Sequence, residues 1–256
     1  MSKIICIANQ KGGVGKTTTA INLSASLAAA EKKTLLIDCD SQGNATSGVG
    51  IDPSTIHEKN LYYGLVQDAP FQEIVCKTDI KTLDIIPSNQ NLIGVEIEFV
   101  SLKDREKRLK NFLKKIDTPY DFIIIDCPPS LGFLTVNALV ASDSLIIPLQ
   151  CEFFALEGLG QLLNSVKLVQ ARLNPSLSLA GILLTMFDQR NRLSHQVAEE
   201  ARKFFGSTVF ETVIPRNVRL SESPSHGLPI ILYDIQSRGA VSYMQLAREI
   251  MANGRV

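Results

Sequence analysis

Residues 9–18 read Asn-Gln-Lys-Gly-Gly-Val-Gly-Lys-Thr-Thr and directly follow a short apolar run, residues 4–8. The glycines let the chain turn with its N–H groups pointing inward and with no Cβ in the way. Ala20, Leu23 and Leu27 recur at helical spacing and predict a helix whose positive N-terminal end adds to the loop. A strand, a glycine-rich loop and a helix in this order predict a binding site for the phosphates of a nucleotide.

Two side chains carry most of the expected phosphate chemistry. Lys16 should reach the β- and γ-phosphates, and the Thr17 hydroxyl should coordinate Mg²⁺. The loop and the first helical turn supply the other nucleotide contacts, which we assign to Gly12, Gly13, Val14, Gly15 and Thr18. The common pattern G-x-x-x-x-G-K-[ST] has a glycine where this chain has Gln10, so the match covers the Gly-Lys-Thr end of the motif. The alternative is a glycine-rich turn that carries a solvated lysine.

Composition favours one well-buried domain. The chain has 256 residues, 45% of them hydrophobic, and a formal net charge of +0. Because the whole chain is not a polycation, nucleic-acid binding must come from a local patch. We expect residues 1–256 to form a single domain. The first strand starts at once, so we expect no N-terminal helix-turn-helix domain.

The cysteines and the apolar segments indicate a cytoplasmic protein. Five cysteines show no C-x-x-C pair and no clustering with histidine, which is typical of reduced, buried thiols. No segment approaches the ~18 continuous apolar residues of a membrane span. The N-terminal apolar run is too short for a signal peptide. We therefore expect no membrane partner.

Apolar runs alternate with helical patterns along the chain. Strands are expected at residues 3–8, 34–38, 83–86, 121–125, 144–149, 179–185 and 208–213. Helices are expected near residues 17–30, 89–116, 131–141, 156–173, 192–205 and 237–252. Several strands are apolar throughout, as strands buried on both faces are. The alternation predicts an α/β fold whose mostly parallel, twisted sheet is flanked by helices on both faces.

Carboxylates follow two of the expected strands. Asp38 and Asp40 open the segment Asp-Cys-Asp-Ser-Gln-Gly-Asn, and Asp126 opens Asp-Cys-Pro-Pro-Ser. Ligands of such sheets bind at the carboxyl ends of the strands, so the three loops should converge there. Asp126 is placed to hold Mg²⁺ through a water. Asp38 and Asp40 are both candidates for orienting the attacking water, and each could instead be a turn carboxylate.

The second lysine of the loop, Lys11, marks a resemblance. The loop resembles the deviant Walker A motif, K-G-G-x-G-K-[ST]-T, of the P-loop NTPase superfamily that includes ParA/Soj, MinD and the nitrogenase iron protein. There the extra lysine crosses a dimer interface and contacts the other subunit's nucleotide. The resemblance implies ATP and Mg²⁺ as cofactors and catalytic roles for Lys11, Lys16 and Asp40, with Asp38 supporting the Mg²⁺ shell. A solvated loop lysine is the alternative for Lys11.

A later segment is more specific for one branch. Residues 215–227 read Pro-Arg-Asn-Val-Arg-Leu-Ser-Glu-Ser-Pro-Ser-His-Gly, and together with residues 42–48 and 126–132 they resemble the ParA/Soj chromosome-partition proteins over nearly the whole chain. The resemblance implies that Pro215 packs on the adenine ring and Asn217 forms a hydrogen bond with it. Pro-Arg-Asn on its own is only a turn.

The resemblance implies a partition ATPase for a chromosome or plasmid. Such proteins are ATP-dependent homodimers that bind double-stranded DNA without sequence preference, in the bacterial cytoplasm and at the nucleoid. A ParB/Spo0J-type partner stimulates their slow hydrolysis and releases the DNA. Candidate DNA contacts are Arg190, Arg216, Arg219 and Arg238, of which the first and third match positions that the family uses. Scattered solvated arginines are the alternative.

Two other readings of the same fold stay open. A MinD-like membrane ATPase would need a basic amphipathic helix at the C-terminus, whereas the apolar positions of residues 243–256 suit packing on the domain. An ATP-dependent metabolic enzyme would need a substrate pocket or paired cysteines, and neither is visible. The basic run 103–115 carries a helical apolar stripe and is either a solvated face or a further DNA or partner surface.

Overall fold

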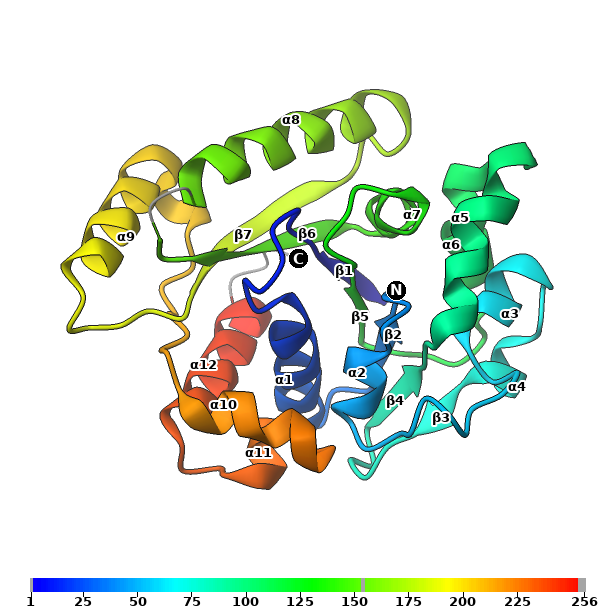
Figure 1. Cartoon of the computed structure of the whole chain (residues 1–256), viewed down its shortest axis with the longest axis horizontal. Helices are drawn as coiled ribbons and strands as arrows, with labels where there is room; N and C mark the ends of the chain where they lie inside the picture. The colour runs from blue at the N-terminus through cyan, green and yellow to red at the C-terminus, as the bar shows by residue number, and fades with distance from the viewer. Residues whose placement is uncertain (1, 153–154, 253–256) are drawn as a thin grey trace.

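The computed structural model describes residues 2–152 and 155–252. One seven-stranded sheet with the order β3-β4-β2-β5-β1-β6-β7 forms the centre of the molecule (Figure 1). Its strands are β1 (Lys3–Ile7), β2 (Thr34–Asp38), β3 (Cys76–Lys77), β4 (Leu83–Ile86), β5 (Phe122–Asp126), β6 (Ser144–Gln150) and β7 (Ser178–Thr185). All neighbouring strands pair in parallel except β3, which runs antiparallel to β4 at the edge. The expected fold class is confirmed.

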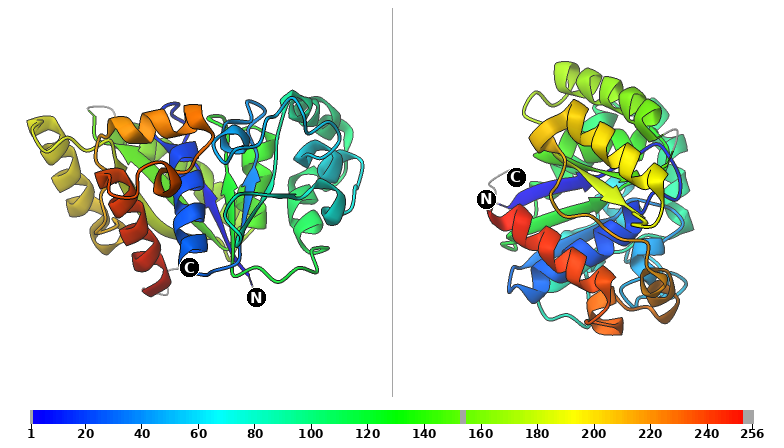
Figure 2. Two further views of the ribbon diagram at one scale, coloured as in Figure 1. Left: turned by 90° about the horizontal axis from the view of Figure 1, so that it is seen from below. Right: turned by 90° about the vertical axis from the view of Figure 1, so that its left-hand side faces the viewer.

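The register of the central strands brings the predicted motifs together. Ile7 at the end of β1 pairs with Asp126 at the end of β5, and Asp38 at the end of β2 pairs with the same residue. The phosphate loop, which we define as residues 9–15, therefore begins level with both aspartates. Figure 2 shows this loop and the start of β1 at opposite ends of the strands.

Helices cover both faces of the sheet. They are α1 (Lys16–Ala29), α2 (Asn44–Ser47), α3 (Leu61–Val66), α4 (Phe71–Ile74), α5 (Gly94–Glu98), α6 (Arg108–Leu113), α7 (Phe133–Ala141), α8 (Ala155–Arg172), α9 (Arg192–Phe205), α10 (Val218–Glu222), α11 (Ile230–Tyr233) and α12 (Arg238–Ala252). α1 and α12 lie on one face, and α7 and α8 lie on the other (Figure 1).

Successive side chains along each strand point to opposite faces of the sheet, so a hydrophobic core forms on each face. Ile5 and Ile7 of β1 pack with α1 and α12, whereas Cys6 between them packs on the opposite side. All three are fully buried, which is why β1 is apolar on both faces after Lys3. Burying one such Ile side chain contributes about 1.5–3 kcal/mol.

The C-terminal helix packs against the domain. Tyr243, Leu246 and Ile250 of α12 are buried with α1, and the Tyr243 hydroxyl shares a hydrogen bond with Thr19 Oγ1 at 3.1 Å. Residues 253–256 of the segment weighed as a membrane anchor lie outside the described residues. No described helix combines the length and the apolar character that crossing a bilayer demands.

Two expectations from the sequence were wrong. Residues 208–213 do not form a strand: a 3-10 turn covers Gly206–Thr208, and the segment that follows meets β7 through an isolated bridge between Val209 and Ile182 and through single backbone hydrogen bonds rather than a continuous ladder. The helical stretch 89–116 is broken into the short helices α5 and α6 and three 3-10 turns, because Leu102 is extended and Asp104 is left-handed with φ of 53°. The two-residue strand β3 was not predicted at all.

Candidate functional site

The glycines of the phosphate loop adopt the conformation that their sequence suggests. Gly13 has a φ of 75° and Gly15 a φ of 87°, in the left-handed region that disfavours other residues. Gly15 is the N-cap of α1, which starts at Lys16. A fourteen-residue helix thus directs its positive end at the space above the loop.

Hydrogen bonds fix the loop to the strands β6 and β7. The Asn9 side chain donates to Pro148 O of β6 at 2.7 Å, and its oxygen accepts from Lys11 N at 3.0 Å. The Thr185 hydroxyl at the end of β7 donates to Val14 O at 2.9 Å. These hydrogen bonds therefore hold the loop in shape.

The two lysines of the loop have opposite environments. Lys16 is buried, with 7% of its surface exposed, and its ammonium donates to Lys11 O at 2.9 Å. Burial lowers the pKa of Lys16, and the negative charge of Asp126 partly offsets this. The Lys11 side chain is 47% exposed and forms an ion pair with Glu152. Lys16 thus points into the site, and Lys11 lies on the surface that rims it.

Asp126 is the buried carboxylate that lacks a partner. It is fully buried, and neither of its oxygens accepts a hydrogen bond. Burial raises the pKa of Asp126 well above its ordinary value, and nearby Asp38 raises it further. The Thr17 hydroxyl and the Lys16 ammonium lower that pKa, although the hydroxyl does not reach hydrogen-bond geometry. A buried carboxylate beside a hydroxyl and a phosphate loop is suited to a cation.

The donor set fits Mg²⁺ bound together with phosphates. Within residues 2–152 and 155–252, no three His, Cys, Asp or Glu side chains gather as a closed metal site. Mg²⁺ commonly uses only one or two protein oxygens and takes its other ligands from phosphates and water. The orphaned oxygens of Asp126 and the hydroxyl of Thr17 supply such a pair.

Asp38 is buried like Asp126, but both of its carboxylate oxygens accept hydrogen bonds. Its Oδ2 accepts from Thr46 N at 2.8 Å and from Thr46 Oγ1 at 2.7 Å, and its Oδ1 accepts from Asp40 N at 3.1 Å. Burial is the main reason why the pKa of Asp38 is raised to about 6, and the bonds from Thr46 oppose that rise. Asp38 therefore ties the start of α2 to the residue that follows Cys39.

Asp40 is the more accessible of the two carboxylates after β2. It is half-buried, and its Oδ1 accepts from Gln42 N at 3.0 Å. We call residues 39–43 the Asp40 loop. This loop leaves one Asp40 oxygen for a further partner at the edge where the phosphate loop ends.

The Pro-Arg-Asn segment lies next to the phosphate loop. A cavity of about 340 Å³ has walls that include Gly15, Thr18, Thr185, Pro215, Asn217 and Tyr243. Asn217 is the N-cap of α10, where its oxygen accepts from Arg219 N at 2.8 Å. That cap uses the amide oxygen and leaves the amide nitrogen as a donor. The predicted adenine residues thus line one hollow with the predicted phosphate residues.

The candidate arginines lie on two neighbouring segments and on α12. Arg216 N donates to Phe187 O at 3.0 Å, which joins the 215–219 segment to the loop that carries Arg190. Arg190 and Arg219 are exposed and pair with acids of their own segments, Asp188 at 3.2 Å and Glu222 at 3.0 Å. Arg238 is exposed at the start of α12. Nearby carboxylates therefore neutralise part of this basic surface.

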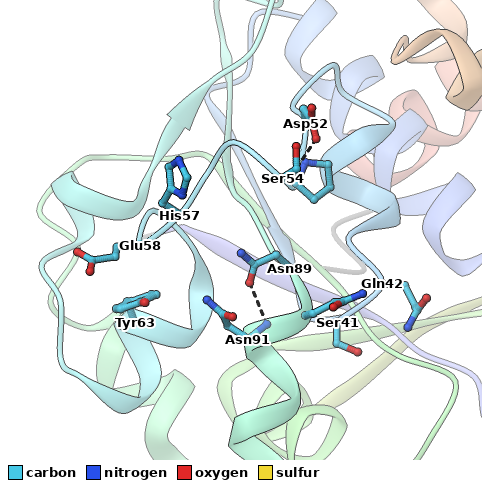
Figure 3. Close-up of a pocket in the computed structure, with 11 residues that line it drawn as sticks. Ser41, Gln42, Asp52, Ser54, His57, Glu58, Tyr63, Asn89 and Asn91 are labelled. Carbon is cyan, nitrogen blue, oxygen red and sulfur yellow. Dashed lines mark hydrogen bonds between the residues drawn. The ribbon is translucent and has the colours of Figure 1, made fainter.

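Sequence reasoning missed three parts of the site. Glu152 follows β6, and its position after a strand end could have marked it. Thr46 belongs to a quoted motif but received no role. A hollow beside the Asp40 loop, lined in part by Gln42, Tyr63 and Asn89, could not be seen without the fold (Figure 3).

Comparison with known proteins gives the family. Residues 2–179 match the model of a family described as "AAA domain". The chain is 58% identical over 254 residues to the sporulation initiation inhibitor protein Soj of Bacillus subtilis, covering 99% of this chain and 100% of the relative. It is 57% identical over 251 residues to the chromosome partitioning protein ParA of Myxococcus xanthus, covering 98% of this chain and 88% of that protein.

A solved structure supports the fold and the expected cofactors. Cobyrinic acid a,c-diamide synthase from Mycobacterium smegmatis, with bound ATP analog and magnesium, superposes with a TM-score of 0.87 at 34% identity and covers 100% of this chain and 96% of its own. Two relatives above 55% identity, matched over nearly the whole chain, decide the family. The chain belongs to the ParA/Soj family of chromosome-partitioning ATPases.

Proposed function

We propose that this protein is a nucleotide-controlled partition switch, in which Mg²⁺-ATP closes a homodimer, the dimer binds DNA, and hydrolysis releases it. The observation that carries the proposal is the meeting of Lys16, Thr17 and Asp126 beside the exposed Lys11. The buried groups form a nucleotide site within one chain. The exposed lysine is free of that site and can act on a second copy.

Within one chain, the phosphate loop and Lys16 would hold the triphosphate. Gly12, Gly13, Val14, Gly15, Lys16, Thr17 and Thr18 are the proposed contacts, with Pro215 and Asn217 at the base, whereas Lys11 would contact the nucleotide of the second copy. Thr17 and Asp126 would hold Mg²⁺, which when bound neutralises charge on the phosphate oxygens. Lys16 contributes a buried positive charge where negative charge develops in the transition state.

Asp40 is proposed to orient the attacking water. Its half-buried carboxylate has one oxygen committed to Gln42 N, so the other can accept a proton or a hydrogen bond from water. Asp38 is a positioning residue because it accepts from Asp40 N and is held by Thr46. Asp38 would thus support Asp40 through its main chain, while Asp126 would hold the cation.

Lys11 is proposed to link nucleotide binding to dimerisation. Its ammonium pairs with Glu152 of its own chain at the rim of the site. A solvent-exposed pair of this kind contributes little, about 0–1 kcal/mol, so phosphates brought by a second copy can displace the carboxylate. The exchange would make the dimer depend on nucleotide.

DNA binding is proposed to need the dimer. Arg190, Arg216, Arg219 and Arg238 are few in one chain, and Asp188 and Glu222 neutralise two of them in part. Two copies double the number of phosphate contacts, and the affinity should fall steeply with salt because each contact releases counterions. We place the protein in the cytoplasm and at the nucleoid, with a ParB/Spo0J-type partner that stimulates hydrolysis.

The alternative function, an ATP-dependent metabolic enzyme, must be compared with the switch, because one similar structure is named as a synthase. Its identity to this chain is 34%, whereas that of the two partition relatives is 57–58%. The test is the turnover of the purified protein with ATP alone. Slow phosphate release that rises with DNA and a partner supports the switch, whereas fast release that needs a carboxylate substrate supports an enzyme.

A further inference from the structure

A hydroxyl at the end of β7 holds the phosphate loop. Thr185 is the last residue of β7 and is buried, and its hydroxyl donates to Val14 O at 2.9 Å. The two residues lie 171 positions apart, and β6 separates β7 from β1, the strand that leads into the loop (Figure 1). No motif of the sequence marks Thr185, so this contact becomes visible only in the fold.

The end of β7 is held on both sides, which fixes the position of the hydroxyl. Thr185 pairs with Gln150 of β6, and from the other side Ile214 N donates to Leu184 O at 2.9 Å. The chain leaves the strand at the next residue, Met186, whose φ of 49° is left-handed. A threonine side chain has few χ1 rotamers because its Cβ is branched. The flexible loop therefore adapts to the hydroxyl, and not the reverse.

The hydrogen bond orients one peptide group of the loop. The carbonyl of Val14 and the N–H of Gly15 belong to the same planar trans peptide, in which they point in opposite directions. Because Val14 O points to β7, the N–H of Gly15 points away from β7, and no group of the described residues accepts it. Gly15 is the N-cap of α1, where free N–H groups favour an anion. A donor of the loop is thus directed at the space that the phosphates would occupy.

The same peptide would turn if the hydroxyl were absent. Val14 is buried, and among the described residues no other donor reaches its carbonyl oxygen. A buried carbonyl without a donor is costly, so the peptide would rotate toward another partner and take the N–H of Gly15 with it. Glycine on one side of the peptide makes such a rotation easy.

We propose that Thr185 is a positioning residue for nucleotide binding, whose hydroxyl holds the Val14–Gly15 peptide with its N–H directed at a phosphate. The N–H would meet that phosphate before and during the chemical step. Loss of the hydroxyl should therefore raise KM and leave kcat almost unchanged. The inference rests on the proposed function for the placement of the phosphates in this loop.

The test separates the hydroxyl from the methyl group at one position. Thr185→Val removes the hydroxyl and keeps the branched shape, Thr185→Ala removes both groups, and Thr185→Ser keeps the hydroxyl. Thr82→Val is the matched control, because the Thr82 hydroxyl donates to Ala28 O at 2.7 Å near the opposite end of α1. Titration with fluorescent analogues of ADP and ATP gives the affinities of each full-length variant. The melting temperature without nucleotide, KM and kcat are measured in parallel.

Both variants without the hydroxyl should lose nucleotide affinity. Thr185→Val and Thr185→Ala should bind ADP and ATP about tenfold more weakly, with KM raised to match and kcat within about twofold of the natural value. Thr185→Ser should stay within about threefold of the natural affinity, because its hydroxyl can still reach the carbonyl although its χ1 is less restricted. Thr82→Val should lower the melting temperature and leave the affinity unchanged.

Three results would overturn the proposal. They are a natural affinity in Thr185→Val, an equal loss of affinity in Thr82→Val, and a larger loss in Thr185→Ser than in Thr185→Val. The second would assign the effect to general stability, and the third to the methyl group. A fall in kcat with KM unchanged would place Thr185 in the chemical step and also contradict the proposal.

Lys16→Ala distinguishes a failure of this inference from a failure of the proposed function. If Lys16→Ala loses nucleotide affinity and Thr185→Val does not, the loop binds the phosphates and only the role of Thr185 is wrong. If both variants keep their affinity, the phosphates lie elsewhere, and the proposed site is wrong together with this inference.

Discussion

The ammonium of Lys16 donates a hydrogen bond to the main-chain carbonyl of Lys11 at 2.9 Å. The buried ammonium is thus held by a neutral carbonyl, which belongs to the same loop that would surround the phosphates. Burial lowers the pKa of Lys16, and Asp126 limits that effect. A nucleotide phosphate would replace a neutral acceptor by a charged one, which makes the hydrogen bond stronger.

Replacing Lys16 tests the nucleotide site itself. Lys16→Ala should weaken ATP binding about 10–100-fold, because a hydrogen bond to a charged group contributes about 1.5–3 kcal/mol. Titration with a fluorescent ATP analogue measures the change. Lys33→Ala, an exposed lysine before β2, is the matched control. An unchanged affinity in Lys16→Ala would remove this lysine from the phosphate site.

Replacing Lys11 separates nucleotide binding from dimerisation. Lys11→Ala should keep ATP affinity within about twofold, since its side chain pairs with Glu152 at the rim and the Lys16 contact uses only its backbone. The variant should remain monomeric with ATP in light scattering and should lose cooperative DNA binding. A variant that dimerised and held DNA normally would show that Lys11 does not bridge the subunits.

Asp126 is expected to lower the stability of the empty protein. Its carboxylate is buried without a hydrogen bond, and its pKa is raised because the charged form is disfavoured there. Asp126→Asn should therefore raise the melting temperature without nucleotide by about 2–4 °C, if about 1 kcal/mol is recovered. The same variant should lose the stabilisation that Mg²⁺ adds to ATP. Mg²⁺ and EDTA arms of one thermal-shift series show both effects, and a variant that still gains from Mg²⁺ would have another metal ligand.

Asp40 should control the chemical step and not binding. Asp40→Ala should reduce phosphate release by about 10²–10⁴-fold, the usual size of general acid–base contributions, and leave an ATP-bound dimer. Single-turnover phosphate release is the measurement. Asp40→Asn keeps the turn bond to Gln42 N and serves as the conservative control. Rapid release from Asp40→Ala would move the role elsewhere, with Asp38 the next residue to test.

The salt dependence of DNA binding should identify the arginines that contact DNA. Arg190→Ala or Arg219→Ala should weaken DNA binding for all sequences alike and lower the slope of log affinity against log salt by about one per lost contact. Arg172→Ala, at the end of α8, is the control for a change in net charge. A slope equal to that of the natural protein would place that arginine away from DNA.

The fold could be predicted where burial alone decides it. β1, β2 and β5 are apolar on both faces, and the polar residues that follow them had to meet at one edge. Residues 208–213 look equally apolar, yet Phe210 lays its ring against Gly181, where a Cβ would come within 2.5 Å. The segment still lies along β7, where Phe210 N donates to Ile182 O at 3.0 Å, but an isolated bridge forms there in place of a continuous ladder. Side-chain packing of this kind is invisible in a pattern of apolar residues.

The site, too, could be predicted only in part from the sequence. The phosphate loop and Asp126 are local in sequence, so their pattern predicted where they would lie. The residues alone left Asp38 and Asp40 as equal candidates, and the resemblance favoured Asp40. The structural difference between them lies in Thr46, eight residues from Asp38, which donates to the carboxylate of Asp38 and not to that of Asp40. The ion pair of Glu152 with Lys11 and the hollow beside the Asp40 loop depend on the approach of distant segments and needed the fold.

The central claim is that nucleotide state controls DNA binding through the dimer. The most direct test is DNA binding by the purified protein with ATP, with ADP and without nucleotide, across one salt series. The account predicts tight, salt-sensitive and cooperative binding with ATP only, lost in Lys11→Ala. Equal binding in all three nucleotide states would contradict it.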